Sequence, residues 1–119
     1  MRKIDVRQYE VVIAMPDGQK TTDFYVMKDS LCICVVHPSL QLDGRELLKR
    51  GKIIDKIEAA EDFVMLEDGE YEKVKTAFEN VKGFSKNDMV MVDRVLNAEE
   101  IEVAEKVKSK KEVKGKREG

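Results

Sequence analysis

The clearest pattern of apolar and polar positions runs through residues 68–97 and predicts two helices joined by a short turn. The first helix carries apolar residues at three- and four-residue spacings, which place them on one face: Tyr71, Val74, Phe78 and Val81. We expect Asp68 to cap the first amides of this helix. Gly83 can then adopt a left-handed conformation after the last turn, and Phe84 can fold back onto that turn.

The second helix of the pair is expected to begin at Ser85. Asp88 follows three residues later and completes a variant of the capping box, in which two side chains bond the first backbone amides. The apolar stripe of this helix is formed by Met89, Val92 and Leu96, flanked by Met91 and Val95. The spacing therefore predicts a helical hairpin.

The N-terminal part of the chain predicts two strands. Residues 4–15 are rich in β-branched side chains and alternate between two faces. Pro16-Asp17-Gly18 is typical of a turn, because proline fixes its own φ and glycine tolerates a positive one. Residues 21–26 follow as the second strand of an antiparallel hairpin. A lone hairpin is marginal in water, so we expect the helices to cover one face of it.

The apolar run over residues 31–36 is short, and its periodicity fits two structures. Cap-type residues precede it at Asp29 and Ser30, and Pro38 follows it, which favours a short helix. The β-branched content favours a buried strand instead. We expect the helix, and in either case a part of the core.

Three more segments complete the predicted order of elements. Asp43 precedes a helix over residues 45–60, in which Gly51 weakens the helix or marks a break. Residues 63–66 predict extended chain or a third strand. Residues 100–103 alternate and predict an edge strand. The apolar residues expected to share one face of the 45–60 helix are Leu47, Ile54, Ile57 and Ala60.

These elements predict an α+β fold, in which an N-terminal antiparallel β-hairpin packs on three or four helices. We expect one small domain over residues 1–103. Residues 104–119 are rich in lysine and lack an apolar stripe, which predicts a disordered basic tail. The tail carries a net charge of +4 and residues 1–103 a net charge of −6. An acidic body repels nucleic acid, so we expect a protein as the partner instead.

Composition indicates a cytoplasmic protein. Hydrophobic residues make up 42% of the 119-residue chain, enough for a folded core, and charged residues make up 39%. The longest apolar run is too short to cross a membrane, and the N-terminal residues lack the apolar core of a signal peptide. Cys32 and Cys34 lie too close in sequence to pair with each other, as is usual in a reducing compartment.

Cys32, Cys34 and His37 are the candidate metal or nucleophile residues, in the spacing C-x-C-x-x-H. A tetrahedral zinc site needs four ligands, and the chain has no other Cys or His to supply a second pair. A nucleophilic thiol needs a lowered pKa, whereas this apolar run is expected to raise it. We therefore expect no metal, no cofactor and no catalytic residue, and interpret the two thiols as core residues.

Acidic residues gather around the predicted segment 63–66, namely Glu58, Glu61, Asp62, Glu67, Asp68, Glu70 and Glu72. They lack the ordered spacing of a calcium loop, and they coincide with helix ends where carboxylates serve as caps. Glu61, Asp62, Glu67 and Asp68 are the candidates for an acidic surface that docks a basic partner.

The helical hairpin also has the spacing of a helix-turn-helix, with Lys86, Asn87 and Arg94 as candidate contacts to nucleic acid or to a protein. Asp88 and Asp93 on the same helix would repel phosphates. The alternative hypothesis is accordingly a small nucleic-acid-binding regulator that adds its basic tail to this hairpin.

Several segments between Leu42 and Val103 resemble small, mostly uncharacterised proteins encoded in tailed phages and prophages. They are Gly44-Arg-Glu-Leu-Leu-Lys-Arg50, Glu70-Tyr-Glu-Lys-Val74, Gly83-Phe-Ser-Lys-Asn-Asp88 and Arg94-Val-Leu-Asn-Ala98. The resemblance implies a virion, assembly or host-interaction factor and transfers no functional residue. The leading hypothesis is a non-enzymatic protein–protein interaction or assembly factor, with an exposed edge of the hairpin or the acidic surface as its contact.

Overall fold

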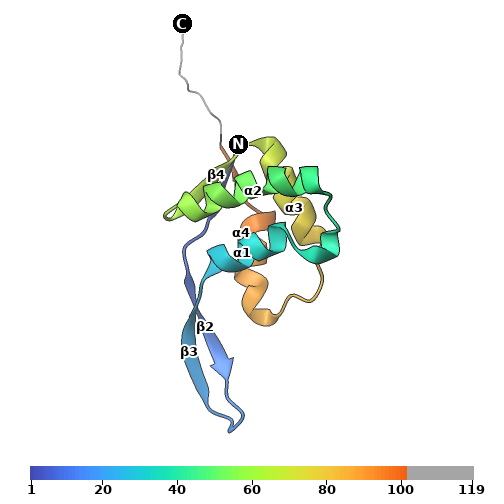
Figure 1. The fold of residues 1–119 in the computed structure, drawn as a ribbon. Coiled ribbons are helices and arrows are strands. Elements are labelled where there is room, and N and C mark those ends of the chain that lie inside the picture. The colour runs from blue at the N-terminus through green and yellow to red at the C-terminus, as the bar shows by residue number, and fades with distance from the viewer. Residues whose placement is uncertain (102–119) are drawn as a thin grey trace, which may run out of the picture.

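The computed structural model of the protein describes residues 1–101 (Figure 1). The predicted tail over residues 104–119 and the last two residues of the predicted 100–103 strand lie outside these residues. Within them the α+β class is confirmed: antiparallel strands near the N-terminus are followed by four α-helices. No helix in the described part has the length and apolar content needed to cross a bilayer.

A small antiparallel sheet runs through the helical body, with β1 (Arg2–Asp5) as its central strand. β1 pairs with β4 (Phe63–Leu66) on one side and with β5 (Glu99–Glu100) on the other. The third strand expected at residues 63–66 is therefore confirmed. Ile4 on β1 lies opposite Val64 on β4, and both side chains are buried.

The single strand predicted over residues 4–15 was wrong, because the chain breaks into β1 and β2 (Tyr9–Ala14). The carboxylate of Asp5 accepts a hydrogen bond of 3.0 Å from the backbone amide of Arg7, two residues later. Such a local bond forms a turn and competes with strand pairing. The amide of Val6 bonds instead to the carbonyl of Asp62, at 2.9 Å. The chain thus leaves the sheet before it enters the hairpin.

The four helices are α1 (Met27–Val35), α2 (Gly44–Ala59), α3 (Asp68–Asn80) and α4 (Met89–Leu96). Two short 3₁₀ helices, η1 (Pro38–Leu40) and η2 (Lys86–Asp88), precede α2 and α4. The helix expected over residues 31–36 is confirmed for residues 31–35 within α1, which begins at Met27, before the expected cap residues Asp29 and Ser30. The Asp43 carboxylate caps α2 through the amide of Glu46 at 2.8 Å, and α2 continues through Gly51 without a break.

The helical hairpin of α3 and α4 has the expected turn but different helix ends. Glu67, rather than Asp68, is the N-cap residue of α3 and forms a capping box with Glu70. The predicted capping box of Ser85 and Asp88 is confirmed at the start of η2. Gly83 has a φ of +95°, as expected, but α3 already ends at Asn80.

The core lies where the sheet and all four helices meet. The aromatic ring of Phe84 folds back onto Phe78 as expected, with 5.6 Å between the ring centroids. On α4 the fully buried residues are Met91 and Val95, the predicted flanking pair, whereas Met89 is 65% exposed. Because α4 is apolar on nearly every side, the spacing of its residues could not select the buried face. The largest side chains that are fully buried are Tyr71, Ile4, Met27, Leu31, Ile53, Ile57, Leu66 and Met91.

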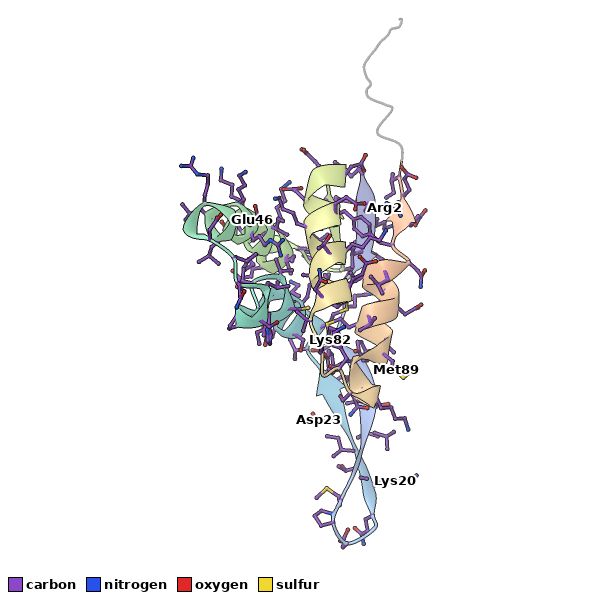
Figure 2. The ribbon with its side chains drawn as sticks, turned by 90° about the vertical axis from the view of Figure 1, so that its right-hand side faces the viewer. Arg2, Lys20, Asp23, Glu46, Lys82 and Met89 are labelled. Carbon is purple, nitrogen blue, oxygen red and sulfur yellow. The ribbon has the colours of Figure 1, made fainter. Side chains whose placement is uncertain are left out.

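A second sheet consists of the hairpin of β2 and β3 (Lys20–Tyr25), which projects away from the helices (Figure 1). The hairpin and its turn are confirmed, with Tyr9 opposite Tyr25 at one end and Ala14 opposite Lys20 at the other. Only the end with the two tyrosines packs against the body. Figure 2 shows Lys20 and Asp23 on the part of the hairpin that lies beyond the helices.

Candidate functional site

The projecting hairpin, residues 9–25, is the most distinctive surface of the described chain, and we call it the arm. Residues 10–24 are all exposed except Val11, which is half-buried. Several exposed side chains of the arm are large and apolar: Phe24 is 60% exposed, Val12 56% and Met15 44%. A water-exposed hairpin normally carries polar side chains on at least one face. The arm instead presents apolar groups to solvent on both of its faces.

The register of the hairpin defines these two faces, because directly opposed residues share a face. Val12 lies opposite Thr22, and Glu10 lies opposite Phe24. Val12 and Phe24 are therefore diagonal neighbours on the same face. The other face carries Val11, Ile13 and Met15 in a row that continues from Tyr9 at the helical body.

Two stacked tyrosines join the arm to the helices. The rings of Tyr9 and Tyr25 lie 4.8 Å apart between centroids, with 14° between their planes. The hydroxyl of Tyr9 donates a hydrogen bond of 2.9 Å to the carbonyl of Asn87. The hydroxyl of Tyr25 donates to the carboxylate of Asp88. Both strands of the arm are thereby anchored to η2, the turn that precedes α4.

Arg94 fixes the same end of the arm from α4. Its guanidinium lies 5.0 Å from the centre of the Tyr9 ring and donates a hydrogen bond of 2.7 Å to the carbonyl of Arg7. It also lies 3.6 Å from the carboxylate of Asp5. We call Tyr9, Tyr25, Asp88 and Arg94 the root of the arm. The root connects both sides of the hairpin to one helix.

The protonation states at the root are complementary. Burial raises the pKa of the Tyr25 phenol, and the hydrogen bond to Asp88 raises it further. Burial also tends to raise the pKa of Asp88, but hydrogen bonds from the Ser85 amide, the Tyr25 hydroxyl and the Ser85 hydroxyl outweigh it. The pKa of Asp88 is consequently lowered. At neutral pH Tyr25 is the donor and Asp88 the ionised acceptor, the stronger arrangement for this bond.

Acidification is expected to loosen the arm at its root. The pKa of Asp88 is lower in the folded protein than in an unfolded chain, where it is about 3.9. The stabilisation from ionised Asp88 is therefore fully present above the unfolded pKa and is lost as the pH falls through the folded pKa. Asp88→Asn should weaken the root by about 1 kcal/mol at neutral pH and reduce its acid dependence. Amide NMR shifts of Tyr25 across the acidic range measure the acid dependence, and urea denaturation at neutral pH measures the loss of stability.

Asp93→Asn is the matched control for this prediction. Asp93 lies on the same helix, and its carboxylate accepts a hydrogen bond of 2.8 Å from the Asn97 side chain rather than from the arm. The control should keep the acid dependence of the Tyr25 amide. Equal pH profiles for the two variants would contradict the role given to Asp88.

The structure separates the candidate acidic residues into two groups at opposite ends of β4. Glu61 and Asp62 are exposed just before the strand, and Asp62 accepts a backbone bond from Val6. Glu67 caps α3, and the Asp68 carboxylate pairs with the N-terminal amine at 2.8 Å. That hydrogen bond lowers the pKa of Asp68. These residues therefore lie at the two ends of one short strand, and Glu67 and Asp68 also serve as a helix cap and as an ion-pair partner.

The candidate basic residues lie close to the root. The side chain of Arg94 and the backbone carbonyl of Asn87 both contact Tyr9, as described above, and Lys86 beside them is exposed. Arg94 is held by Arg7 and Asp5 and does not project from α4. The recognition helix of a helix-turn-helix presents its side chains outward. Arg94 does not have this outward arrangement, whereas Lys86 is exposed.

Cys34 and His37 line one hollow of about 190 Å³ beside the root, together with Tyr25 and Asp88. Burial raises the pKa of Cys34 to about 12, and the charge of Asp88 adds to this. Burial likewise raises the pKa of Cys32 to about 11. Both thiols are therefore protonated at neutral pH.

The His37 ring accepts a hydrogen bond of 3.1 Å from the Ser39 amide and caps η1. Within residues 1–101, no three Cys, His, Asp or Glu side chains converge to hold a metal.

No protein-family model, curated protein or solved structure matches this chain. The role of the arm is therefore inferred from its residues and their geometry.

Sequence reasoning missed the root, although one signal pointed to it. Residues opposed across a hairpin are equally distant from its turn, and Tyr9 and Tyr25 are equally distant from Asp17. The position of the turn in the sequence was therefore enough to predict that the two tyrosines lie opposite each other. Their anchoring to Asp88 and Arg94 joins residues more than 60 positions apart, as in the Tyr25 bond to Asp88. No local pattern reports such a contact.

Proposed function

We propose that this protein is a non-enzymatic interaction or assembly factor that contacts a protein partner through the arm. The observation that carries the proposal is the exposure of large apolar side chains on a hairpin that stands clear of the core. Phe24 and Val12 do not belong to the core cluster of the described residues. Full burial of such a side chain from water is worth about 1.5–3 kcal/mol, and this is the upper limit for each of the two partly exposed residues.

The root prepares the arm for binding. A flexible hairpin would lose conformational entropy on association, and that loss reduces affinity. The stacked tyrosines and the Arg94 contacts already fix the base of both strands. The cost of ordering the base of the arm is thereby met within the folded chain. Aromatic and apolar residues on a rigid support are also the usual high-energy contacts of protein interfaces.

The resemblance to small phage and prophage proteins supports an assembly or accessory role over a catalytic one. The protonated thiols and the capping roles of the candidate carboxylates give no support to catalysis. We therefore place the function in the arm and its partner.

Removing the apolar side chains of the arm should abolish partner binding while the fold is kept. Val12→Ser and Phe24→Ser together remove the two exposed groups on one face. We expect capture of the natural partner to fall at least tenfold, since the loss of about 1.4 kcal/mol already gives that factor. Affinity capture from the native host, with the bound proteins quantified by mass spectrometry, measures the change.

Leu48→Ser is the matched control, because Leu48 is a 74% exposed apolar residue on α2, away from the arm. This variant should capture the same partner as the unaltered chain. A partner that is retained by the arm variant and lost with Leu48→Ser would overturn the assignment of function to the arm.

A further inference from the structure

The two outer edges of the arm differ in the groups they expose. The amide of Met15 bonds to Gln19 at 2.7 Å, and the carbonyl of Met15 accepts from Gly18 at 3.0 Å, so both groups of Met15 face β3. Backbone groups alternate in direction along a strand. Those of Glu10, Val12 and Ala14 therefore point away from β3. Within residues 1–101 the arm contains only β2 and β3, so this edge of β2 is unpaired.

The outer edge of β3 is protected. The outward-facing amide of Phe24 donates a hydrogen bond of 2.8 Å to the side chain of Asp23. A neighbouring charge and an occupied amide are typical devices that stop an edge strand from pairing with another chain. Lys20 lies at the other end of the same edge. β2 carries one charged residue, Glu10, at the end beside the body, and its other outward-facing residues, Val12 and Ala14, are apolar.

We propose that two copies of the chain pair through this open edge, β2 against β2, in an antiparallel arrangement with Val12 on the two-fold axis. The inference rests on the proposed function, because it names the partner of the arm. The result is a four-stranded sheet in the order β3-β2-β2-β3, built from one arm of each copy. Strand addition at an exposed edge is a common mode of recognition.

The register follows from the backbone groups that need partners. With Val12 opposite its own copy, Glu10 lies opposite Ala14 of the second copy, and the reverse pair forms by symmetry. All outward-facing amides and carbonyls of β2 are then hydrogen-bonded. Moving the axis to Val11 or Ile13 would leave Ala14 or Glu10 without a partner inside the strand.

Charge selects the antiparallel arrangement of a second copy. A parallel pair would bring Glu10 beside Glu10 of the other copy, and like charges on adjacent strands are destabilising. In the antiparallel register Glu10 faces the small side chain of Ala14, and Lys20 lies directly beyond it because Ala14 and Lys20 are opposed in the hairpin. Glu10 can therefore approach Lys20 of the second copy across that alanine. The arm is therefore complementary to a second copy of itself, in hydrogen bonding through β2 and in charge through Glu10 and Lys20.

The pairing also gathers the exposed apolar residues. Val11, Ile13 and Met15 share a face of the arm, and the two-fold axis brings the corresponding row of the second copy beside it. The bodies lie at opposite ends of the paired strands, because the arm extends away from the helices (Figure 1). The paired segment is about 20 Å long at 3.3 Å per residue, so the helices of the two copies do not compete for the same space.

Proline substitution tests the edge without breaking the hairpin. Val12→Pro removes an amide that faces away from β3, and proline is tolerated where the lost amide faces solvent. Thr22→Pro is the matched control. Thr22 lies opposite Val12, and its amide points away from β2, at the outer edge of β3. Sedimentation equilibrium should show that the unaltered chain is a dimer within the range of protein concentrations from about 1 µM to 1 mM. Val12→Pro should be a monomer and Thr22→Pro a dimer, and a Val12→Pro variant that stays dimeric would overturn the proposal.

A cysteine cross-link tests the register. Residues on the axis of a hydrogen-bonded pair have Cα atoms about 5.5 Å apart, within the range of a disulfide. In a Cys32→Ser background, Val12→Cys should form a disulfide-linked dimer on mild oxidation. Thr22→Cys should not form this disulfide. Residue 22 lies on the outer strand of each copy, so the two Cα atoms are three strand spacings, or about 14 Å, apart. Equal cross-linking at the two positions would exclude the Val12 axis.

Failure of this inference is separable from failure of the proposed function. A monomeric protein that captures a different protein through Val12 and Phe24 would overturn the pairing of two copies and keep the arm as the interaction surface. A monomeric protein without arm-dependent capture would overturn both.

Discussion

Replacing Arg50 with Met is expected to lower the free energy of unfolding by roughly 2–3 kcal/mol and the melting temperature by about 10–20 °C. Arg50 is the one charged residue that is buried among residues 1–101, with 7% of its surface exposed. Its guanidinium donates 3.0 Å hydrogen bonds to the Glu46 carboxylate and to the Val35 carbonyl at the end of α1. The side chain therefore joins α1 to α2.

Loss of the guanidinium leaves two groups short of partners. The Val35 carbonyl at the helix end loses its donor, and an unsatisfied buried carbonyl costs about 1–3 kcal/mol. Glu46 keeps the ammonium of Lys73 at 2.7 Å, which is why the expected cost stays below that of a fully broken buried pair. The hydrogen bond from Lys73, followed by that from Arg50, lowers the pKa of Glu46. The variant should accordingly be less sensitive to acid than the unaltered chain.

Arg45→Met is the control for the loss of charge, because Arg45 lies on the same helix and is exposed. It should change the free energy of unfolding by less than about 0.5 kcal/mol. Urea denaturation of both variants, monitored by far-UV circular dichroism, gives the comparison. A similar loss of stability in the two would show that Arg50 acts only through its net charge.

Phe78→Ala is expected to lower the free energy of unfolding by about 3–5 kcal/mol, more than the loss of the Arg50 guanidinium. Phe78 is 4% exposed and belongs to the core cluster, where it packs against the ring of Phe84. Truncation removes the ring and leaves a cavity that the surrounding helices cannot fill. Thermal unfolding by calorimetry measures the loss, and a variant too unstable to fold at about 25 °C is consistent with it.

Phe24→Ala makes the same chemical change on the arm, where the ring is 60% exposed. At protein concentrations low enough to keep the chain monomeric, we expect a change below about 0.5 kcal/mol. The contrast between the two phenylalanines separates a residue that serves the fold from one that is free to bind. Comparable destabilisation at both sites would mean that the arm packs on the body in solution.

Local sequence patterns predicted most of the elements, because each depends on neighbouring residues. The turn at Pro16-Asp17-Gly18, the cap at Asp43 and the capping box of Ser85 and Asp88 are all encoded within four residues. The break between β1 and β2 was missed because β-branched residues continue on both sides of it. β1 ends because the Asp5 side chain accepts the hydrogen bond of the Arg7 amide, which is therefore not available to a neighbouring strand.

The features that the sequence did not predict depend on contacts between residues far apart in the chain. We had expected charged residues to be solvated, so the buried Arg50 on α2 was not foreseen. Leu47 was expected on the same apolar helix face as Ile57, but it is 47% exposed whereas Ile57 is fully buried. The expected cover of the hairpin by helices was confirmed only at its base. Whether a hairpin lies on a body or projects from it depends on the direction in which the chain leaves the preceding strand. At this point in the chain, contacts of Val6 and Arg94 with distant residues fix that direction.

The tyrosine stack also gives the protein an intrinsic spectroscopic signal at the base of the arm. The chain contains no tryptophan and three tyrosines, and two of these form the stack while the third, Tyr71, is buried in the core. Tyr71 contributes to tyrosine emission and near-ultraviolet dichroism as well, but its place in the core keeps it away from the arm, so a change of this signal on binding reports on Tyr9 and Tyr25. A rearrangement of the hairpin on binding can be followed from this signal in unlabelled protein.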